Sequence, residues 1–394
     1  MSLLPIILWG ILLYSGTTIA APWRAIATNP TDKVRRGEVL EIPIRSLTGS
    51  SASVLSQWQV INETTQEELT TQTVDQDGDS LPDLILIQTD FEPLETKSFL
   101  MQPGPSTRTQ DPAKITFGRF VPERLDDFAW ENDLVAFRMY GPALAAEGGG
   151  SGLDCWLKRV TYPIINKWYD LALKGISYHQ DHGEGYDPYH VGASRGCGGL
   201  SYGVGGAVIS PGVYLRHRVI TNGPLRTEFE LTYKTNLPDG STLEETKRIA
   251  IDLGSRLTRF DISLRGSSAI PHIDLLLGLT THEGKAHVQL APESGYISAW
   301  ELIDDAYLGT GIVALPDSIL RATEVRSSSR DQAHAYLYGR GLSPRPFRYY
   351  AGYGWAKAME IVSEESWTRY LRDFAENLQS PISLTITDTL SQSL

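Results

Sequence analysis

The sequence lacks several signals that would assign it to a large protein class. Its 394 residues contain no P-loop, no glycine fingerprint for dinucleotides, no nucleophile elbow and no internal repeat. These absences remove several large enzyme classes, and we expect no nucleotide cofactor. Basic residues are also in the minority: the chain has 35 Lys and Arg but 47 Asp and Glu, which gives a net charge of -12. Phosphate neutralisation needs basic surface, so we expect no nucleic-acid partner, although a local arginine cluster can still bind an anionic substrate.

The N-terminus has no lysine or arginine before its apolar stretch, Leu3–Thr18. This stretch is short for a membrane span, which needs about 20 residues. It ends in Thr18-Ile19-Ala20, whose small side chains suit cleavage by signal peptidase. We therefore predict a signal peptide over residues 1–20, cleavage after Ala20, a periplasmic or secreted location, and no stable membrane insertion after cleavage. An uncleaved anchor is the alternative.

Cysteine is scarce as well. Cys155 and Cys197 are the only two. An exported chain can pair them in a disulfide, whereas two free buried thiols would behave as small apolar residues. The sequence leaves both possibilities open.

What the chain does contain is a succession of short strands. Hydrophobic residues make up 41% and charged residues 21% of the sequence, so a sizeable core can form. Residues 23–102 predict a small β domain, and residues 103–112, rich in Pro, Ser and Thr, predict a linker. In residues 113–390, short segments alternate apolar and polar residues, which is typical of large antiparallel sheets with one wet face. They include Phe229–Tyr233, Arg248–Leu253, Arg259–Leu264 and His287–Leu290.

One late segment is helical by its pattern. Within Ser363–Gln379, apolar residues share one face, with Ser363 as N-cap and Glu364 and Glu365 in the first turn. Pro381 ends this helix, and Ile382–Thr387 predicts a return to strand.

An acidic loop in the small domain is a candidate cation site. Asp75, Asp77, Asp79 and Asp83 surround a glycine turn, and alternating oxygen ligands of this kind suit calcium. The distal Glu of an EF-hand is missing, and a hairpin rich in Asx turns, without metal, explains the loop equally well. In either case we expect a structural role.

The segment Ser177–Gly199 is the strongest candidate for a functional site. It gathers three His, two Asp, one Glu, three Tyr, one Arg and six Gly, a mixture that neither helical nor strand periodicity explains. Such groups move protons, hold metals or bind anions, and glycine lets the backbone approach a ligand closely. The predicted catalytic residues are Tyr178, His179, His182, Glu184 and Tyr186. His182 and Glu184 are also candidate ligands of a divalent metal, with His282 or His190 as a further imidazole; a long surface loop is the alternative.

Candidate substrate-binding residues lie outside and inside this segment. Arginine binds carboxylates through two parallel hydrogen bonds, and tryptophan stacks on sugar rings. On this basis Arg124, Trp130 and Arg138 could form one wall of a cleft, and Tyr353 and Trp355 a carbohydrate platform. The alternatives are a salt-bridged surface for Arg124–Arg138 and ordinary core packing for Tyr353 and Trp355.

Several of these runs resemble one bacterial family. The segments that show the resemblance are PERLDDFAWENDLVAFRMYGPAL, SYHQDHGEGYDPYHVGASRGCGG, TNGPLRTEFELTY, AGYGW and ESWTRYLRDFAENLQSPI, together with the DxDGDxxPD loop. Over residues 24 to 388 the chain resembles the exported domain-of-unknown-function family "four-eight-six-one", which is found with polysaccharide-degradation genes. The resemblance implies an antiparallel β-supersandwich of the galactose-mutarotase or polysaccharide-lyase type. It also implies carbohydrate chemistry, since one member looks like a dehydratase acting on the uronic acid ends of oligosaccharides.

The expected chemistry makes definite demands on side chains. Removing water across C4–C5 of a uronic acid needs a base for the C5 proton, an acid for the leaving hydroxyl and a cation for the carboxylate. Candidates are His182 or Tyr178 as base or acid, Glu184 as orienting group or metal ligand, and Arg138 and Arg195 as carboxylate binders. We therefore expect a carbon–oxygen lyase with an acidic oligosaccharide as substrate. A sugar epimerase or hydrolase on the same fold, and a carbohydrate-binding protein without catalysis, are the alternatives.

Overall fold

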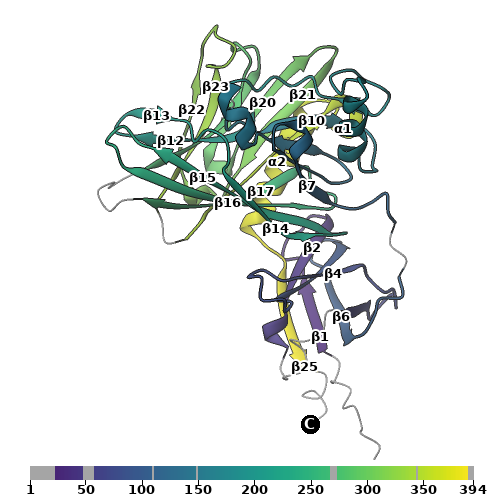
Figure 1. Ribbon diagram of the computed structural model, residues 1–394. Coiled ribbons are helices and arrows are strands. Elements are labelled where there is room, and N and C mark those ends of the chain that lie inside the picture. Colours follow the sequence, from purple (N-terminus) through teal and green to yellow (C-terminus); the bar gives the residue numbers. More distant parts are fainter. Residues whose placement is uncertain are drawn as a thin grey trace, which may run out of the picture.

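The computed structural model describes residues 23–47, 57–108, 111–147, 150–266, 273–342 and 345–388. The predicted signal peptide lies outside these residues, as do positions 109–110 of the predicted linker. The fold is mainly β, as predicted, with neighbouring strands antiparallel in each sheet. Figure 1 shows a larger body above and a smaller β domain below it. In the part of the chain that the structure describes, no helix is long and apolar enough to cross a membrane.

The small domain is built from a four-stranded sheet, β25-β1-β6-β3, and a three-stranded sheet, β2-β5-β4. Apolar side chains of both sheets form one core, which includes Trp23, Trp58, Ile85 and Phe99. The strands are β1 (Trp23–Thr28), β2 (Arg35–Pro43), β3 (Trp58–Asn62), β4 (Thr71–Val74), β5 (Leu84–Phe91), β6 (Thr96–Pro103) and β25 (Ser383–Asp388).

The last strand of the chain belongs to the small domain. Strand β25 pairs with β1 along its whole length, from Trp23 opposite Asp388 to Thr28 opposite Ser383. In Figure 1 the yellow β25 lies beside the purple β1. The sequence predicts a strand here but places it in the larger domain, because pairing between chain ends that are so far apart leaves no local signal.

The larger body contains three sheets with a common core. One five-stranded sheet consists of β7 (Phe117–Val121), β8 (Asp127–Glu131), β9 (Ala136–Met139), β10 (Asp154–Lys158) and β11 (Gly185–Tyr186). The other consists of β12 (Cys197–Val204), β13 (Ala207–Ile209), β18 (Asp274–Thr280), β22 (Ile319–Val325) and β23 (His334–Arg340). The eight-stranded sheet consists of β14 (Arg216–Asn222), β15 (Arg226–Asn236), β16 (Thr242–Asp252), β17 (Leu257–Gly266), β19 (His287–Ala291), β20 (Tyr296–Ile303), β21 (Ala306–Val313) and β24 (Phe347–Trp355). Buried side chains from all three sheets pack into one cluster.

Two helices complete the larger body. Helix α2 (Glu364–Gln379) starts at the predicted N-cap, Ser363, whose side chain accepts a hydrogen bond from the N–H of Ser366. It packs against β21 so closely that a Cβ added to Gly309 would lie 2.4 Å from the ring of Trp367. Helix α1 (Ile165–Leu173) lies against the sheet of β8 and was not predicted.

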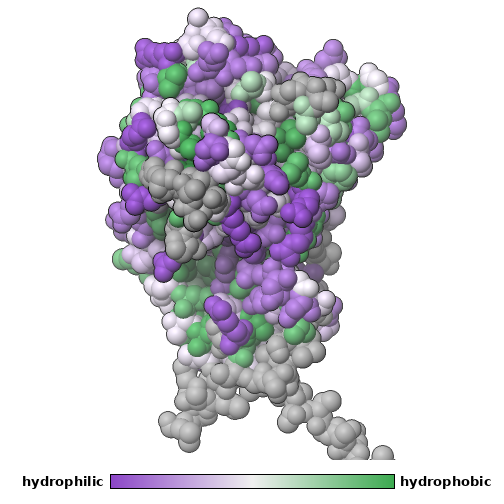
Figure 2. Space-filling model, turned by 60° about the vertical axis from the view of Figure 1, so that its left-hand side comes forward, coloured by the Kyte–Doolittle hydropathy of each residue, from purple (hydrophilic) through white to green (hydrophobic). Residues whose placement is uncertain are grey.

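The surface is mixed in character. In the view of Figure 2, hydrophilic residues cover much of the face, and hydrophobic residues occur between them in scattered patches. This pattern is typical of a surface in contact with water.

The side chain of Gln72 on β4 is one of the links between the two domains. Its Nε2 donates to Thr221 and to the carbonyl of Arg226, both at 2.8 Å. Its Oε1 accepts from the N–H groups of Leu225 and Arg226, both at 2.9 Å. Gln72 is 7% exposed. If its side chain were lost, water would have little access to these partners and would not restore their hydrogen bonds.

We predict that Gln72→Leu destabilises the protein by about 2–4 kcal/mol, because it leaves buried polar groups without partners. Calorimetry of the two proteins measures the change in melting temperature. Gln59→Leu is the matched control, since Gln59 bonds to Pro105 at the surface and its loss should cost about 0.5 kcal/mol. Equal melting temperatures for Gln72→Leu and the wild type would contradict the prediction.

The acidic loop between β4 and β5 brings three of its four predicted carboxylates together. Ligand oxygens of Asp75, Asp77 and Asp83 lie within 4.8 Å of one another. Asp79 is not in this group, and its Oδ1 accepts from the N–H of Leu81 at 2.8 Å. The N–H groups of Gly78 and Ser80 donate to Asp75 and hold its pKa below the usual range. Calcium binding by this loop stays a prediction.

If calcium binds here, millimolar Ca²⁺ added to chelator-treated protein should stabilise it by about 1–2 kcal/mol, the value for a site of sub-millimolar affinity. Thermal unfolding with and without Ca²⁺ measures this. Asp75→Asn should abolish the response, whereas Asp79→Asn should keep it. A wild type that melts at one temperature in both conditions would show that the loop is an ordinary hairpin.

Candidate active site

Helix α1 is fixed to the sheet by a buried ion pair. Glu131 on β8 accepts the N–H groups of Ile164 and Ile165 at 2.9 Å, at the positive end of the helix. Lys158 on β10 donates to Glu131 at 2.7 Å and to the carbonyls of Asn132 and Tyr162 at 2.9 and 3.0 Å. Both charged side chains are fully buried. Every proton of the ammonium group therefore has an acceptor, and the helix has its cap.

Just beyond α1, the side chain of Tyr178 lies between two arginines. Gly175, with φ of +82°, turns the chain after the helix, and Tyr178 follows. The ring of Tyr178 packs on Trp156 with 4.8 Å between ring centres. Its hydroxyl oxygen accepts hydrogen bonds from Arg124 and Arg138, each at 3.2 Å. The oxygen atom of Tyr178 is therefore held between two guanidinium groups.

His179 lies beside this tyrosine. Its ring centre is 4.6 Å from that of Tyr178, and its side chain is 58% exposed. The Nδ1 atom is 2.8 Å from the carbonyl oxygen of Asp187 and 3.4 Å from its carboxylate. Because a carbonyl oxygen only accepts, Nδ1 carries a proton, and Nε2 remains for a proton exchange with a ligand.

These groups line a cavity of about 350 Å³, which is large enough for a sugar ring. Its other walls come from α1 and the residues after it, including Tyr169, Leu173 and Gly175. Arg124 also lines the cavity and uses only Nε for Tyr178, so its terminal nitrogens have no hydrogen-bond partner among the described residues. The turn that carries Arg124 is strained, since Leu125 and Asp126 have φ of +52° and +60°.

Arg138 lies behind the cavity and is surrounded by carboxylates. It donates to Asp154 at 2.6 and 2.9 Å and to Asp187 at 3.2 Å, and Asp127 lies 3.7 Å away. Its guanidinium group is therefore occupied, which argues against its predicted role as a carboxylate binder. Burial, followed by the charge of Asp154, raises the pKa of Asp187 well above its usual range. Burial also raises the pKa of Asp127 to about 6, and neither oxygen of Asp127 has a hydrogen-bond partner.

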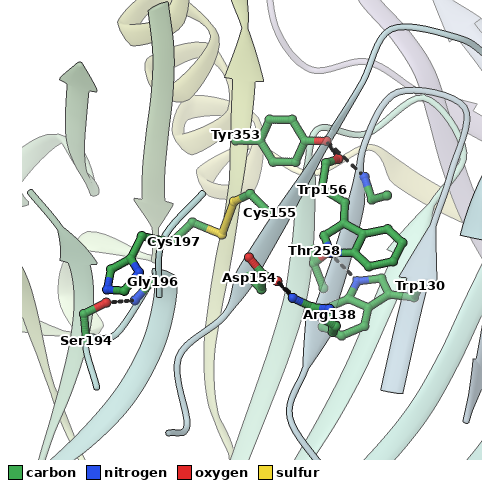
Figure 3. The surroundings of a disulfide bond; sticks show 12 residues. Trp130, Arg138, Asp154, Cys155, Trp156, Ser194, Gly196, Cys197, Thr258 and Tyr353 are labelled. Atoms are coloured by element: carbon green, nitrogen blue, oxygen red, sulfur yellow. Dashed lines mark hydrogen bonds and ion pairs between the residues drawn. A yellow bond between two sulfur atoms is a disulfide. The ribbon is translucent and has the colours of Figure 1, made fainter. Parts of the chain in front are cut away.

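A disulfide lies next to this cluster. Cys155 on β10 and Cys197 on β12 are bonded, with 6.7 Å between their Cα atoms. Figure 3 shows the disulfide beside Asp154 and Arg138, and near Gly196. It joins the two five-stranded sheets at the point where the loop 177–199 ends. Of the two possibilities that the sequence leaves open, a disulfide or two free thiols, the structure has the disulfide.

The other predicted catalytic and metal-binding residues do not converge on the cavity. His182 is exposed, and its Nε2 lies 3.0 Å from the carbonyl of Ser177. Glu184 binds Lys167 at 2.6 Å and Trp168 at 3.2 Å, and Tyr186 donates to Asp304 at 3.0 Å.

The proposed set of His182, Glu184 and His282 is also not brought together. His282 instead bonds Glu301 at 2.8 Å. Among the described residues, the three aspartates of the acidic loop form the one group with metal-ligand spacing.

The predicted aromatic platform is part of the core. Trp130 and Tyr353 are fully buried and Trp355 is 1% exposed, so none of these rings can stack on a sugar. Trp130 donates to Thr258 at 3.0 Å, as Figure 3 shows, and Tyr353 donates to the carbonyl of Trp156. Arg195 is likewise buried and donates to Ser151, Ser210 and backbone carbonyls. The structure thus gives the three aromatic side chains a packing role, and it places Arg195 in a buried hydrogen-bond network.

We predict a pH-dependent difference between Asp127→Asn and the wild type. The folded protein holds the proton of Asp127 more tightly than the unfolded chain, so its contribution to stability is present near pH 4 and is lost as the pH rises through about 6. The variant, which is always neutral there, should gain about 3 kcal/mol relative to the wild type between pH 4 and 7. Denaturant unfolding at several pH values measures this, and a difference that does not change with pH would contradict it.

Comparison with known proteins identifies the family. The family model described as "Domain of unknown function (DUF4861)" matches residues 27–384. "Uncharacterized protein P7" of Formosa agariphila is 34% identical over 369 residues, which cover 91% of this chain and 92% of that protein.

Two solved structures share the fold. They are an alpha-mannosidase from Enterococcus faecalis V583 and a protein in the Glycosyl Hydrolase Family 38 from Enterococcus faecalis, at 11% and 12% identity. Each has a TM-score of 0.53 and covers 93% of this chain, which spans less than half of those chains, 46% and 47%. The likeness in sequence extends over nearly the whole of both domains, and the chain belongs to the DUF4861 family.

Proposed function

We propose that this protein is an exported carbohydrate-active enzyme, a carbon–oxygen lyase that removes water from the uronic acid end of acidic oligosaccharides. The observation that carries the proposal is the position of the Tyr178 hydroxyl between two guanidinium groups, in a cavity that also holds His179 and the free end of Arg124. The match of the fold to glycoside-processing enzymes supports carbohydrate as the substrate class. The disulfide supports an oxidising compartment, in agreement with the predicted signal peptide.

In this proposal each group has a separate role. Arg124 binds the carboxylate at C5 through its terminal nitrogens, which withdraws electrons and acidifies the C5–H bond. Tyr178, whose hydroxyl oxygen faces both arginines, is the base that takes the C5 proton. The electron pair of that bond forms the C4–C5 double bond while the C4–O bond breaks.

The leaving group needs a proton from a second group in the cavity. In this proposal His179 is the acid: it donates a proton from Nε2 to the departing C4 oxygen, while Nδ1 stays bonded to the carbonyl oxygen of Asp187. One water leaves and the unsaturated sugar is formed: Tyr178 has gained the C5 proton, and His179 has given one proton to the departing oxygen. His179 is 58% exposed, so it can take a new proton from solvent.

A hydrolase has less support from the same cavity. Glycoside hydrolysis in most families needs a pair of carboxylates on either side of the scissile bond. Among the residues lining the cavity Glu123 is the one acid, and it pairs with Arg119. The elimination reaction, which needs a base, an acid and a cation, fits the lining better.

The test is to incubate the mature protein with uronic-acid-terminated oligosaccharides and to record near-ultraviolet absorbance and the loss of one water by mass. We expect Tyr178→Phe to lower kcat about 10²–10⁴-fold, because it removes the base but keeps the ring packing. Arg124→Gln should raise KM and lower kcat, since it removes the carboxylate partner.

Tyr162→Phe is the matched control. Tyr162 is 40% exposed and bonds Glu184 outside the cavity, so this variant should keep wild-type activity. No loss of water from any acidic glycan would refute the lyase, and full activity of Tyr178→Phe would move the site elsewhere.

A further inference from the structure

A second cavity lies in the small domain, away from the site at Tyr178. Its volume is about 350 Å³, which is enough for one sugar ring. Residues of β2 and β5 line it from one sheet of the domain, and residues of β3 and β6 line it from the other. The cavity is therefore an opening at one end of the core between the two sheets. The proposed elimination reaction does not use it.

Three strands bring a polar residue to this cavity at a position that faces the core. These residues are Asn62 on β3, Thr89 on β5 and Lys97 on β6. Side chains alternate along a strand, and the residues two positions away on the same faces are buried in the core: Val60, Ile87, Phe91 and Phe99. In the pairing of β3 with β6, Asn62 lies opposite Phe99, two positions from Lys97. Polar residues at neighbouring core positions indicate a function other than packing.

Asn62 has an amide group without a partner. The residue is 5% exposed, and its Oδ1 accepts the N–H groups of Thr64 and Thr65 at 2.9 and 3.2 Å. These two donors fix which side-chain atom is the oxygen. The Nδ2 atom has no hydrogen-bond partner among the described residues. Because buried polar groups are nearly always hydrogen-bonded, the cavity that Asn62 lines is where an acceptor can be supplied.

Lys97 and Thr70 add further polar groups to the same lining. The ammonium nitrogen of Lys97 is 3.6 Å from Oε2 of Glu95, which is too long for a hydrogen bond, and 5.6 Å from the ring centre of Phe91. The hydroxyl of Thr70 has no hydrogen-bond partner in the part of the chain that the structure describes. An amide, an ammonium and a hydroxyl are thus available to a ligand that offers acceptor oxygens.

The charges around the cavity do not select an anion. Glu67 pairs with Arg108 at 2.7 Å, and Asp90 pairs with Arg36 at 3.2 Å. The nearest carboxylate to the ammonium of the lining is that of Glu95. Each of these cations therefore has a carboxylate beside it, and no surplus positive charge is left among the described residues. An uncharged ligand with several hydroxyl groups suits this lining better than an acidic one.

We propose that this cavity of the small domain binds a neutral sugar unit of a glycan. Asn62 and Lys97 donate to hydroxyl oxygens of the sugar, and Thr70 exchanges a hydrogen bond with a further hydroxyl. A neutral unit has no carboxylate for Arg124, so it is not a substrate for the reaction at Tyr178. The inference goes beyond the proposed function and does not depend on it.

The experiment follows the side-chain amide signals of the isotope-labelled mature protein by NMR. D-glucose, D-galactose, D-mannose and D-xylose are added one at a time. Asn62→Asp assigns the signal, because it removes the amide but keeps the oxygen that accepts from the turn. We expect a saturable shift of the Asn62 signal with at least one of these sugars. The amide of Gln102, which bonds Gln59 outside the cavity, should not shift.

Two variants test the other donors. Lys97→Met removes the ammonium but keeps an unbranched apolar stem beside Phe91, and Thr70→Val removes the hydroxyl but keeps the shape. Each should weaken the affinity about 3–10-fold, the effect of one lost hydrogen bond. Thr64→Val is the matched control, because Thr64 is exposed on the same turn but does not line the cavity, and it should bind like the wild type. Unchanged melting temperatures will show that all three variants are folded.

The outcomes separate this inference from the proposed function. A saturable shift at Asn62 that also occurs in Tyr178→Phe supports the site, whether or not the wild type removes water from any glycan. A shift that disappears in Tyr178→Phe would place the sugar in the first cavity and overturn the second site. A constant Asn62 signal with all four sugars would overturn it as well. An equal response to glycerol, or a response to sodium glucuronate alone, would show that the ligand is not a neutral sugar.

Discussion

The candidate active site depends on one buried ion pair, Glu131 with Lys158. Two charges without contact to water are costly unless further hydrogen bonds satisfy them. Here two backbone carbonyls accept from Lys158, and two backbone N–H groups donate to Glu131. What the pair provides is position rather than net stability. The carboxylate of Glu131 accepts the first N–H groups of the helix, as the side chain of an N-cap residue would. For this reason α1 begins at Ile165. Tyr169 lies on this helix and Tyr178 follows it, and both line the cavity. The ion pair on the sheet therefore sets the position of this wall of the cavity.

The second constraint is an excess of acid around one arginine. Three aspartates share the guanidinium of Arg138, and burial prevents water from screening them. At least one of them is therefore easier to protonate than an ordinary aspartate. The same crowding keeps Arg138 rigid, and a rigid donor is what the hydroxyl of Tyr178 requires if its charge is to be stabilised throughout a reaction. The cluster thus acts as a support for the site and does not meet the substrate itself.

How much of this could be predicted from the sequence differs between fold and site. The antiparallel strands and α2 follow from local patterns, because alternation and capping residues are adjacent in the chain. Helix α1 gives no such signal, since its cap is Glu131, more than thirty residues earlier. Arg124, Tyr178 and His179 are candidates by residue type, and the structure places them in one cavity. Trp130, Tyr353 and Arg195 were chosen by type as well, but burial cannot be deduced from residue type alone.

The pairing of β25 with β1 has a consequence for how the protein is made. The sheet that carries β1 cannot be completed until β25 has emerged from the ribosome. Until then the edge of β1 is open, and open edges invite pairing with other chains. The larger body, with all its strands inside residues 117–355, can fold while that edge waits. Order of synthesis and order of folding are therefore reversed for the small domain, whose four-stranded sheet is complete only when β25 is present.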